Sequence, residues 1–318
     1  MMKRGIKISI LGAGSVGASI AYTLTMDGMA SEIVLIDINY DKAKGEAMDI
    51  MQGTAFSMPV DIYAGDYTNA ANSDIVIVTV GMARKAGQSR IDLAQANVNI
   101  IKEVTPKIVK YAPDATYIVV SNPVDIITYT ILKTTDLVEH QVIGSGTMLD
   151  SARLRSGLAE HVRMNSQNVH AYVFGEHGDT SMIPWSLTTI AGMEMIQYCT
   201  HICEGHNQCG KKDLKDIKND MRTSGSKIID LKGATYYAIA LAVRRLCDSV
   251  LRDARSVHTV SSMMHGQYGI DDVCLSLPFV IGIYGILRCI TPVLLDHEIK
   301  QLRSSADALK KIISSLDI

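Results

Sequence analysis

Three groups of residues in this sequence have the types and the spacing that proton transfer and anion binding require. His177 lies in Gly-Glu-His-Gly-Asp at positions 175–179, after a β-like run. An imidazole there can give or take a proton near neutral pH. Asp150 can orient such a ring, and Arg153 lies one helical turn beyond it on the same face. Because a guanidinium can bind a carboxylate through two parallel hydrogen bonds, these residues predict acid–base chemistry beside an anion-binding group.

The third group is a glycine-rich loop, with Gly12, Gly14 and Gly17 between an expected strand and an expected helix. Glycines in that place allow the turn, the approach of a pyrophosphate to the backbone, and close packing of helix on strand. The next expected strand, 33–36, ends in Asp37, twenty residues after Gly17, where an acid accepts hydrogen bonds from both ribose hydroxyls and repels a 2′-phosphate. The loop therefore predicts a dinucleotide site that prefers NAD to NADP. The alternative is a structural glycine turn followed by a surface aspartate.

Length and composition limit the class of protein. The chain has 318 residues, which is enough for two domains, and 47% of them are hydrophobic. Its 31 basic and 33 acidic residues give no charge imbalance to attract nucleic acid or an acidic membrane. The apolar runs at 6–11 and 277–287 are too short for an export signal or for the ~20 residues of a membrane span. Six cysteines do not resemble a disulfide framework, so we expect a cytoplasmic protein with reduced thiols.

The elements that position these residues alternate between strand and helix in the first half of the chain. Expected strands at 6–11, 33–36, 74–80 and 116–120 are separated by expected helices, which predicts α/β architecture with a doubly wound parallel (Rossmann) sheet. Ligands bind at the carboxyl ends of such strands, where Gly81 and Asn122 fall.

The pattern changes after residue 146 to a mixed order of helices and strands. We therefore expect a dinucleotide-binding domain at 1–146 and an α+β substrate and catalytic domain at 147–318. The active site is expected in the cleft between the two domains.

Four motifs together resemble the L-lactate and malate dehydrogenases over essentially the whole chain. They are the glycine loop at 12–17, Ser-Asn-Pro-Val-Asp at 121–125, the segment 145–153, and Gly-Glu-His-Gly-Asp at 175–179. The resemblance implies transfer of a hydride between a nicotinamide cofactor and a small 2-oxo or 2-hydroxy acid.

The resemblance also implies roles for individual residues. His177 would be the proton donor, Asp150 its partner, and Arg153 the group that binds the substrate carboxylate. Arg90 would polarise the substrate carbonyl, and Asn122 would lie near nicotinamide and substrate. Each residue alone has a structural interpretation, for example a turn histidine or an ordinary helix ion pair. A non-catalytic NAD-binding protein is disfavoured because the whole set is retained.

The sequence indicates two different substrates. Arg84 stands where malate dehydrogenases carry an arginine that pairs with a second carboxylate, whereas lactate dehydrogenases usually carry a glutamine. An unpaired arginine enclosed beside a methyl group would be costly. Thr235 and the glutamate before His177, in contrast, resemble the bacterial lactate branch. L-Lactate dehydrogenase acting on pyruvate is the first hypothesis, and L-malate dehydrogenase acting on oxaloacetate is the alternative.

Arg155 and His170 match the positions that bind fructose 1,6-bisphosphate between subunits of allosteric bacterial lactate dehydrogenases. Two cations that meet across a symmetric interface repel one another unless an anion lies between them. The family implies a homotetramer, in which such an interface exists. The alternative is that both are surface residues with nothing bound.

The segment 199–209 holds three cysteines and two histidines, which raises the question of zinc. The spacing of Cys203, His206 and Cys209 matches no standard template, and the resembled family has a variable surface loop there without metal. We therefore expect no metal site.

Overall fold

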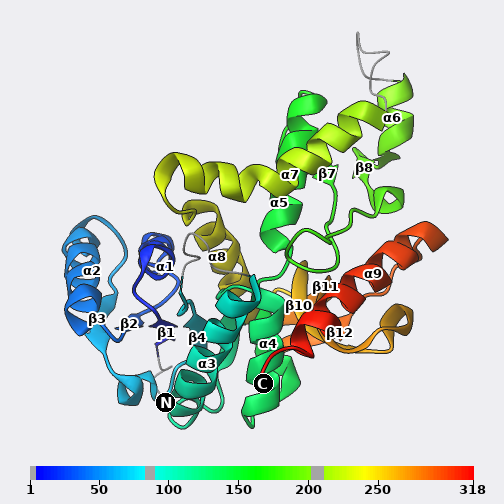
Figure 1. The fold of residues 1–318 in the computed structure, drawn as a ribbon. Coiled ribbons are helices and arrows are strands. Elements are labelled where there is room, and N and C mark those ends of the chain that lie inside the picture. The colour runs from blue at the N-terminus through cyan, green and yellow to red at the C-terminus, as the bar shows by residue number, and fades with distance from the viewer. Residues whose placement is uncertain (1–4, 83–89, 202–210) are drawn as a thin grey trace.

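A computed structural model describes residues 5–82, 90–201 and 211–318. The parallel strands of its first half are β1 (Lys7–Leu11), β2 (Glu32–Ile36), β3 (Asp61–Gly65), β4 (Ile75–Val78), β5 (Thr116–Val119) and β6 (Val142–Gly144). They lie side by side in the order β3-β2-β1-β4-β5-β6. Figure 1 labels the first four of these strands. This is the doubly wound order, in which the topology reverses between β1 and β4 and leaves a crevice for a dinucleotide. The predicted fold class is confirmed.

The second half adds strands to the same sheet. These are β10 (Ser256–His265), β11 (Asp271–Gly282) and β12 (Gly285–Cys289), which run antiparallel, and β10 pairs with β6 through Ser261 and Gly144. The result is one nine-stranded sheet that continues past the expected boundary at residue 146.

A separate three-stranded sheet consists of β7 (Val169–His170), β8 (Thr189–Ile190) and β9 (Met193–Glu194). The β-like run expected from residue 168 to 174 therefore forms a strand of only two residues. The chain then reaches the large sheet, where Gly175 forms a single bridge with Ser276 of β11, and Phe174 forms another with Met182 of the following segment.

Helices cover both faces of the large sheet (Figure 1). The α-helices of the described residues are α1 (Ser15–Asp27), α2 (Tyr40–Gly53), α3 (Arg90–Val109), α4 (Val124–Thr134), α5 (Met148–His161), α6 (Met195–His201), α7 (Lys211–Lys232), α8 (Tyr237–Leu251) and α9 (Asp296–Ile313). Of these, α6 packs on the small sheet and α7 packs on α5. Short 3-10 helices lie at η1 (Thr54–Phe56), η2 (Tyr67–Ala70), η3 (Glu139–Gln141), η4 (Ser166–Asn168), η5 (Trp185–Leu187) and η6 (Gln267–Gly269). No helix in the described ranges combines the length and the apolar character that crossing a membrane requires.

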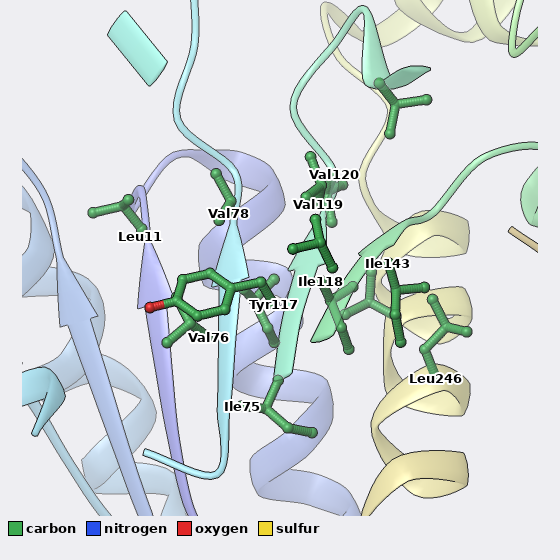
Figure 2. Close-up of a cluster of buried hydrophobic side chains, with 14 of the residues drawn as sticks. Leu11, Ile75, Val76, Val78, Tyr117, Ile118, Val119, Val120, Ile143 and Leu246 are labelled. Carbon is green, nitrogen blue, oxygen red and sulfur yellow. The ribbon is translucent and has the colours of Figure 1, made fainter. Parts of the chain in front are cut away.

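The main hydrophobic core lies around the parallel strands. Residues such as Ile75, Val78 and Ile118 are fully buried, and Leu246 from α8 packs beside them (Figure 2). Strands buried on both faces are continuous apolar runs, which explains the unbroken Ile-Val-Ile-Val of β4. A second core joins α5, α7 and the small sheet. The predicted site residues described below lie on elements that belong to both cores.

Candidate active site

A cavity of about 330 Å³ brings together residues that are far apart in the chain. Five of the predicted site residues line it, namely Asn122, Asp150, Arg153, His177 and Thr235. They come from the end of β5, from α5, from the segment after Phe174, and from the connection between α7 and α8. The expectation that these side chains converge in one cleft therefore holds for the residues that the structure describes.

The His177 ring is held by Asp150. The ring Nδ1 lies 2.6 Å from Asp150 Oδ2, and Arg153 donates from Nη1 to Asp150 Oδ1 over 3.2 Å. Asp150 is 6% exposed, so both contacts form away from bulk water. With Nδ1 committed to the carboxylate, Nε2 is the ring atom available to exchange a proton with a ligand.

The contact between His177 and Asp150 raises the pKa of the histidine and lowers the pKa of the aspartate. Burial disfavours the imidazolium, but the charge and hydrogen bond of Asp150 outweigh it and raise the pKa of His177 to about 9. Burial alone would raise the pKa of Asp150, whereas the charges of His177 and Arg153 lower it below its ordinary value. The stable state near neutral pH is therefore imidazolium beside carboxylate, which is a proton donor poised for use.

A second buried carboxylate, Asp125, accepts a hydrogen bond from the backbone of the same histidine. The sequence alone had indicated no separate role for Asp125. Its Oδ2 accepts a hydrogen bond from the His177 backbone N–H at 2.8 Å, and its Oδ1 accepts one from Ser261 Oγ at 2.6 Å. Burial raises the pKa of Asp125 to about 6, against the opposing effect of these two donors. Its place in the motif at 121–125 was visible, but its partners lie 52 and 136 residues away.

Arg153 has room and donors left for an anion. Its side chain is 15% exposed, and only one guanidinium nitrogen bonds to Asp150. Gly225 of α7 faces the guanidinium, because a Cβ built there would lie 3.5 Å from Nη2. The remaining N–H groups can form the two parallel bonds that a carboxylate accepts.

The glycine loop has the geometry of a pyrophosphate cradle. Gly12 has φ of +105°, and a Cβ on Gly17 would lie 1.9 Å from the Gly12 carbonyl oxygen, so the helix and the loop touch there. A Cβ on Gly14 would meet nothing within 4 Å, which leaves space in front of the first turn of α1. That turn has no side-chain cap, so its N–H groups are available to an anion.

Asp37 follows β2 and is fixed beside the glycine loop. It accepts hydrogen bonds from the backbone N–H groups of Ala13, at 2.7 Å, and Asn39, at 2.8 Å. Each carboxylate oxygen retains a second acceptor position, as contact with ribose hydroxyls requires. These residues together fit an NAD molecule.

Gly81 and Asn122 follow the neighbouring strands β4 and β5. Asn97 of α3 links the two segments that leave these strands. Asn97 accepts a bond from Met82 N–H and donates one to the Asn122 carbonyl, each over 2.7 Å. The predicted residues Gly81 and Asn122 therefore lie at the same edge of the sheet.

Several predictions concern residues outside the described ranges. Arg84 lies outside them, and Arg90 is described only as the first residue of α3, without its side chain. Cys203, His206 and Cys209 also lie outside. Within the described ranges no group of three or more His, Cys, Asp or Glu side chains is placed to hold a metal ion.

Arg155 and His170 lie on different elements. Arg155 is half-buried on α5, and His170 is exposed on β7. Burial, Arg245 and Arg155 lower the pKa of His258 to about 4, which places the Arg155 charge near β10. Within one chain, no hydrogen bond of the described residues connects Arg155 with His170.

Arg222 of α7 lines the cavity and was missed. Its Nη2 donates a hydrogen bond to the Ser181 carbonyl, which joins α7 to the segment that carries His177. The sequence held no signal for it, because Arg222 is one of many charged residues on a long polar helix.

Comparison with known proteins gives a consistent result. The family profile "lactate/malate dehydrogenase, NAD binding domain" matches residues 6–144, and "lactate/malate dehydrogenase, alpha/beta C-terminal domain" matches residues 147–317. The L-lactate dehydrogenase of Acetivibrio thermocellus is 49% identical over 314 residues, which is 98% of each chain. L-Lactate dehydrogenase 1 of Clostridium acetobutylicum is 46% identical over 99% of this chain and 100% of its own.

A solved structure is also similar. The minor L-lactate dehydrogenase from Enterococcus mundtii, in its ligands-bound form, superimposes with a TM-score of 0.94 at 33% identity. The match covers 99% of this chain and 100% of the other. Agreement of the motifs, the sheet order, both profiles and the full-length relatives shows that the chain belongs to the lactate/malate dehydrogenase family.

Proposed function

We propose that this chain acts as an NAD-dependent L-lactate dehydrogenase, which interconverts pyruvate and L-lactate. The observation that carries the proposal is the cavity in which His177 is bonded to Asp150 beside Arg153. Val16, in the first turn of the helix that follows the glycine loop, lines the same cavity. The relatives cited above carry the same activity in their names.

Arg153 binds the substrate carboxylate in this proposal. Two parallel hydrogen bonds fix the plane of the keto acid and so decide which face of the ketone is presented to the cofactor. Asp150 keeps the guanidinium and the imidazole in register, because it bonds to both. Thr235 lies beside the substrate's methyl group, and Asn122 lies near the carbonyl.

Reduced NAD supplies the hydride when it is bound. As the ketone carbon gains that hydride, its oxygen becomes an alkoxide, and protonated His177 donates a proton to it from Nε2. The Asp150 carboxylate stabilises the imidazolium before the transfer and holds the ring afterwards. Arg90 matches the arginine that polarises the substrate carbonyl in the resembled family. In this proposal it has the same role before the transfer.

The cofactor is held by the residues that end β1, β2 and β4. The glycine loop lets the pyrophosphate approach the backbone and the first turn of α1, because Gly12, Gly14 and Gly17 have no side chains. Asp37 binds the ribose hydroxyls, and Gly81 lies along the path of the dinucleotide. We place the division between this cofactor half, 1–146, and the catalytic half, 147–318, at the end of β6.

Steady-state kinetics with NADH and either pyruvate or oxaloacetate test the substrate. We expect kcat/KM for pyruvate to exceed that for oxaloacetate. The feature that favours malate dehydrogenase is Arg84, so Arg84→Gln is the informative variant. A larger kcat/KM for oxaloacetate that disappears in Arg84→Gln would overturn the choice of pyruvate.

His177→Ala tests the assigned chemistry itself. We expect its kcat to fall by about 10²–10⁴, the usual contribution of a positioned acid. His140→Ala, which removes an exposed imidazole that does not line the cavity, is the matched control. Normal turnover in His177→Ala would show that another group donates the proton.

The assembly proposed for the chain is a homotetramer in which Arg155 and His170 of facing subunits bind fructose 1,6-bisphosphate. The supporting observations are that His170 is exposed on β7 and that the Arg155 side chain on α5 is only half-buried in the single chain. We expect a particle of four times the chain's mass in light scattering, and a lower KM for pyruvate with the sugar bisphosphate. No change in either the saturation curve or the mass on adding the sugar would remove the allosteric part of the proposal.

A further inference from the structure

A second cavity, of about 460 Å³, lies between α7 and α9 beside the segment that follows His177 (both helices are labelled in Figure 1). Four basic side chains line it, Lys218 and Arg222 from α7 and His297 and Lys300 from α9. Hydroxyl groups line it as well, from Thr180, Ser181, Ser304 and Ser305. None of the described residues that line the cavity is acidic.

The positive charge in this cavity is not balanced within it. Lys218 and Arg222 are one helical turn apart, a spacing at which like charges destabilise a helix. Lys218 is half-buried, and burial together with the Arg222 charge lowers its pKa. The ion pairs formed among the described residues include neither lysine of the cavity, Lys218 or Lys300.

Three acids on the segments around the cavity form hydrogen bonds or ion pairs with other residues. Glu176 accepts a hydrogen bond from Thr180 Oγ1. Thr180 lines the cavity and Glu176 does not. Glu298 is 1% exposed and accepts bonds from Ser186 Oγ, at 2.6 Å, and the Leu295 N–H, at 3.0 Å. Asp220 pairs with Lys227 over 2.7 Å. No carboxylate of the described residues lines the cavity itself, so a bound anion is the partner that would balance the charge there.

We propose that this cavity is a binding site for a small oxyanion with more than one negative charge, of the phosphate type. Ammonium and guanidinium groups interleaved with hydroxyls are the donors that bind phosphate oxygens. The volume lies within the range of small-molecule pockets, so the phosphate group of a phosphorylated metabolite is the class of ligand that fits.

The proposed site is distinct from the three other anion sites proposed for the molecule, and no residue of the glycine loop lines it. Arg153 lines the catalytic cavity and not this one, and neither Arg155 nor His170 lines either cavity. Arg222 and Ser181, however, line both cavities and are joined by a hydrogen bond. An anion in the second cavity thus contacts a wall of the first.

Calorimetric titration with inorganic phosphate, at an ionic strength held constant with chloride, tests the proposal. The Arg153→Gln/Arg155→Gln protein with NAD present serves as the parent, because the other anion sites are then removed or filled. We expect saturable binding to the parent. Adding Lys218→Gln and Lys300→Gln should weaken it by about tenfold or more, since two charge-assisted hydrogen bonds are lost.

The matched control is Lys215→Gln/Lys311→Gln in the same parent. It removes the same charge from the same two helices at exposed positions outside the cavity, and it should change the dissociation constant by less than about twofold if binding is local. Unchanged thermal midpoints verify that all proteins are folded. The proposal is overturned if the parent does not bind phosphate, if Lys218→Gln/Lys300→Gln binds it as tightly as the parent, or if the control loses as much affinity.

Discussion

At the scale of residues, His177 is served by two carboxylates that act on different parts of it. Asp150 bonds to the ring and is the main source of its raised pKa, whereas Asp125 bonds to the backbone N–H and fixes the position of the His177 backbone. Both acids are buried, and each is also bonded to a second donor, Arg153 or Ser261. His177 is therefore positioned by side chains whose own freedom is restricted.

The raised pKa of His177 predicts how the rate depends on pH. Reduction of pyruvate requires the imidazolium, so kcat/KM should be constant at neutral pH and fall as pH rises through about 9. Oxidation of L-lactate requires the neutral ring and should rise over the same interval. Initial rates from pH 6 to 10.5 measure both. A reduction rate that falls between pH 6 and 7 would contradict the assignment.

Asp125→Asn tests the second carboxylate. An amide at this position can still accept from the His177 N–H and donate to Ser261 Oγ, so the shape persists while the charge is lost. Because the Asp125 charge contributes to the raised pKa of His177, the alkaline limb of the pyruvate profile should move to lower pH. Ser261→Ala keeps the charge and is the control. An unmoved limb in Asp125→Asn would leave Asp125 a purely structural residue.

At the scale of elements, the turn between β1 and α1 and the first turn of α1 contain three glycines. Gly14 and Gly17 are required there for different physical reasons. Gly17 provides contact between helix and loop, whereas Gly14 provides empty space in front of the helix. The two positions look alike in the sequence. They differ in what a methyl group would meet.

Gly14→Ala and Gly17→Ala therefore make a matched pair. The methyl group of Gly17→Ala collides with backbone, so the free energy of unfolding should fall by about 1–3 kcal/mol, the usual cost of overpacking. Gly14→Ala should leave stability within about 0.5 kcal/mol, as at unconstrained surface positions, while NAD affinity falls. Urea unfolding and NADH fluorescence titration measure the two quantities. Equal losses of stability would refute the distinction.

At the scale of the whole molecule, Phe174 ties the catalytic segment to the core. Its side chain is fully buried, its backbone bridges Met182, and the next residue bridges Ser276 of β11. The segment that presents His177 is thus anchored at a point three residues before it.

Phe174→Ala should lower the free energy of unfolding by about 3–5 kcal/mol, the range for large-to-small changes in a core. Phe56→Ala is the control, because Phe56 is 93% exposed in the single chain and its removal should cost less than about 0.5 kcal/mol. Denaturant unfolding of both variants at one protein concentration makes the comparison. Similar losses in the two would show that Phe174 does not anchor the segment.

The sequence was sufficient for what depends on local pattern. The strand, glycine loop, helix and acid from Gly12 to Asp37 follow one another within a short stretch, and the structure places them as expected. Asp150 and Arg153 are likewise neighbours on one helix. The bond between His177 and Asp150 joins residues 27 apart and was expected from the resemblance.

What escaped depends on contacts across long separations or on very short elements. Asp125 meets Ser261 only because β10 joins the sheet beside β6, and Arg222 meets Ser181 only because α7 packs against the catalytic segment. The two-residue strands of the small sheet are below the length at which a period of two can be recognised. No local pattern encodes such encounters.

The antiparallel pairing of β10 with β6 has a practical outcome for dissection of the protein. A fragment that stops at residue 146 would present β6 as an unprotected outer strand, with its backbone amides and carbonyls on that side available to other chains. Such a fragment should self-associate even though all six strands that surround the dinucleotide crevice are present. Adding the separately expressed remainder should suppress that association by restoring the missing neighbour.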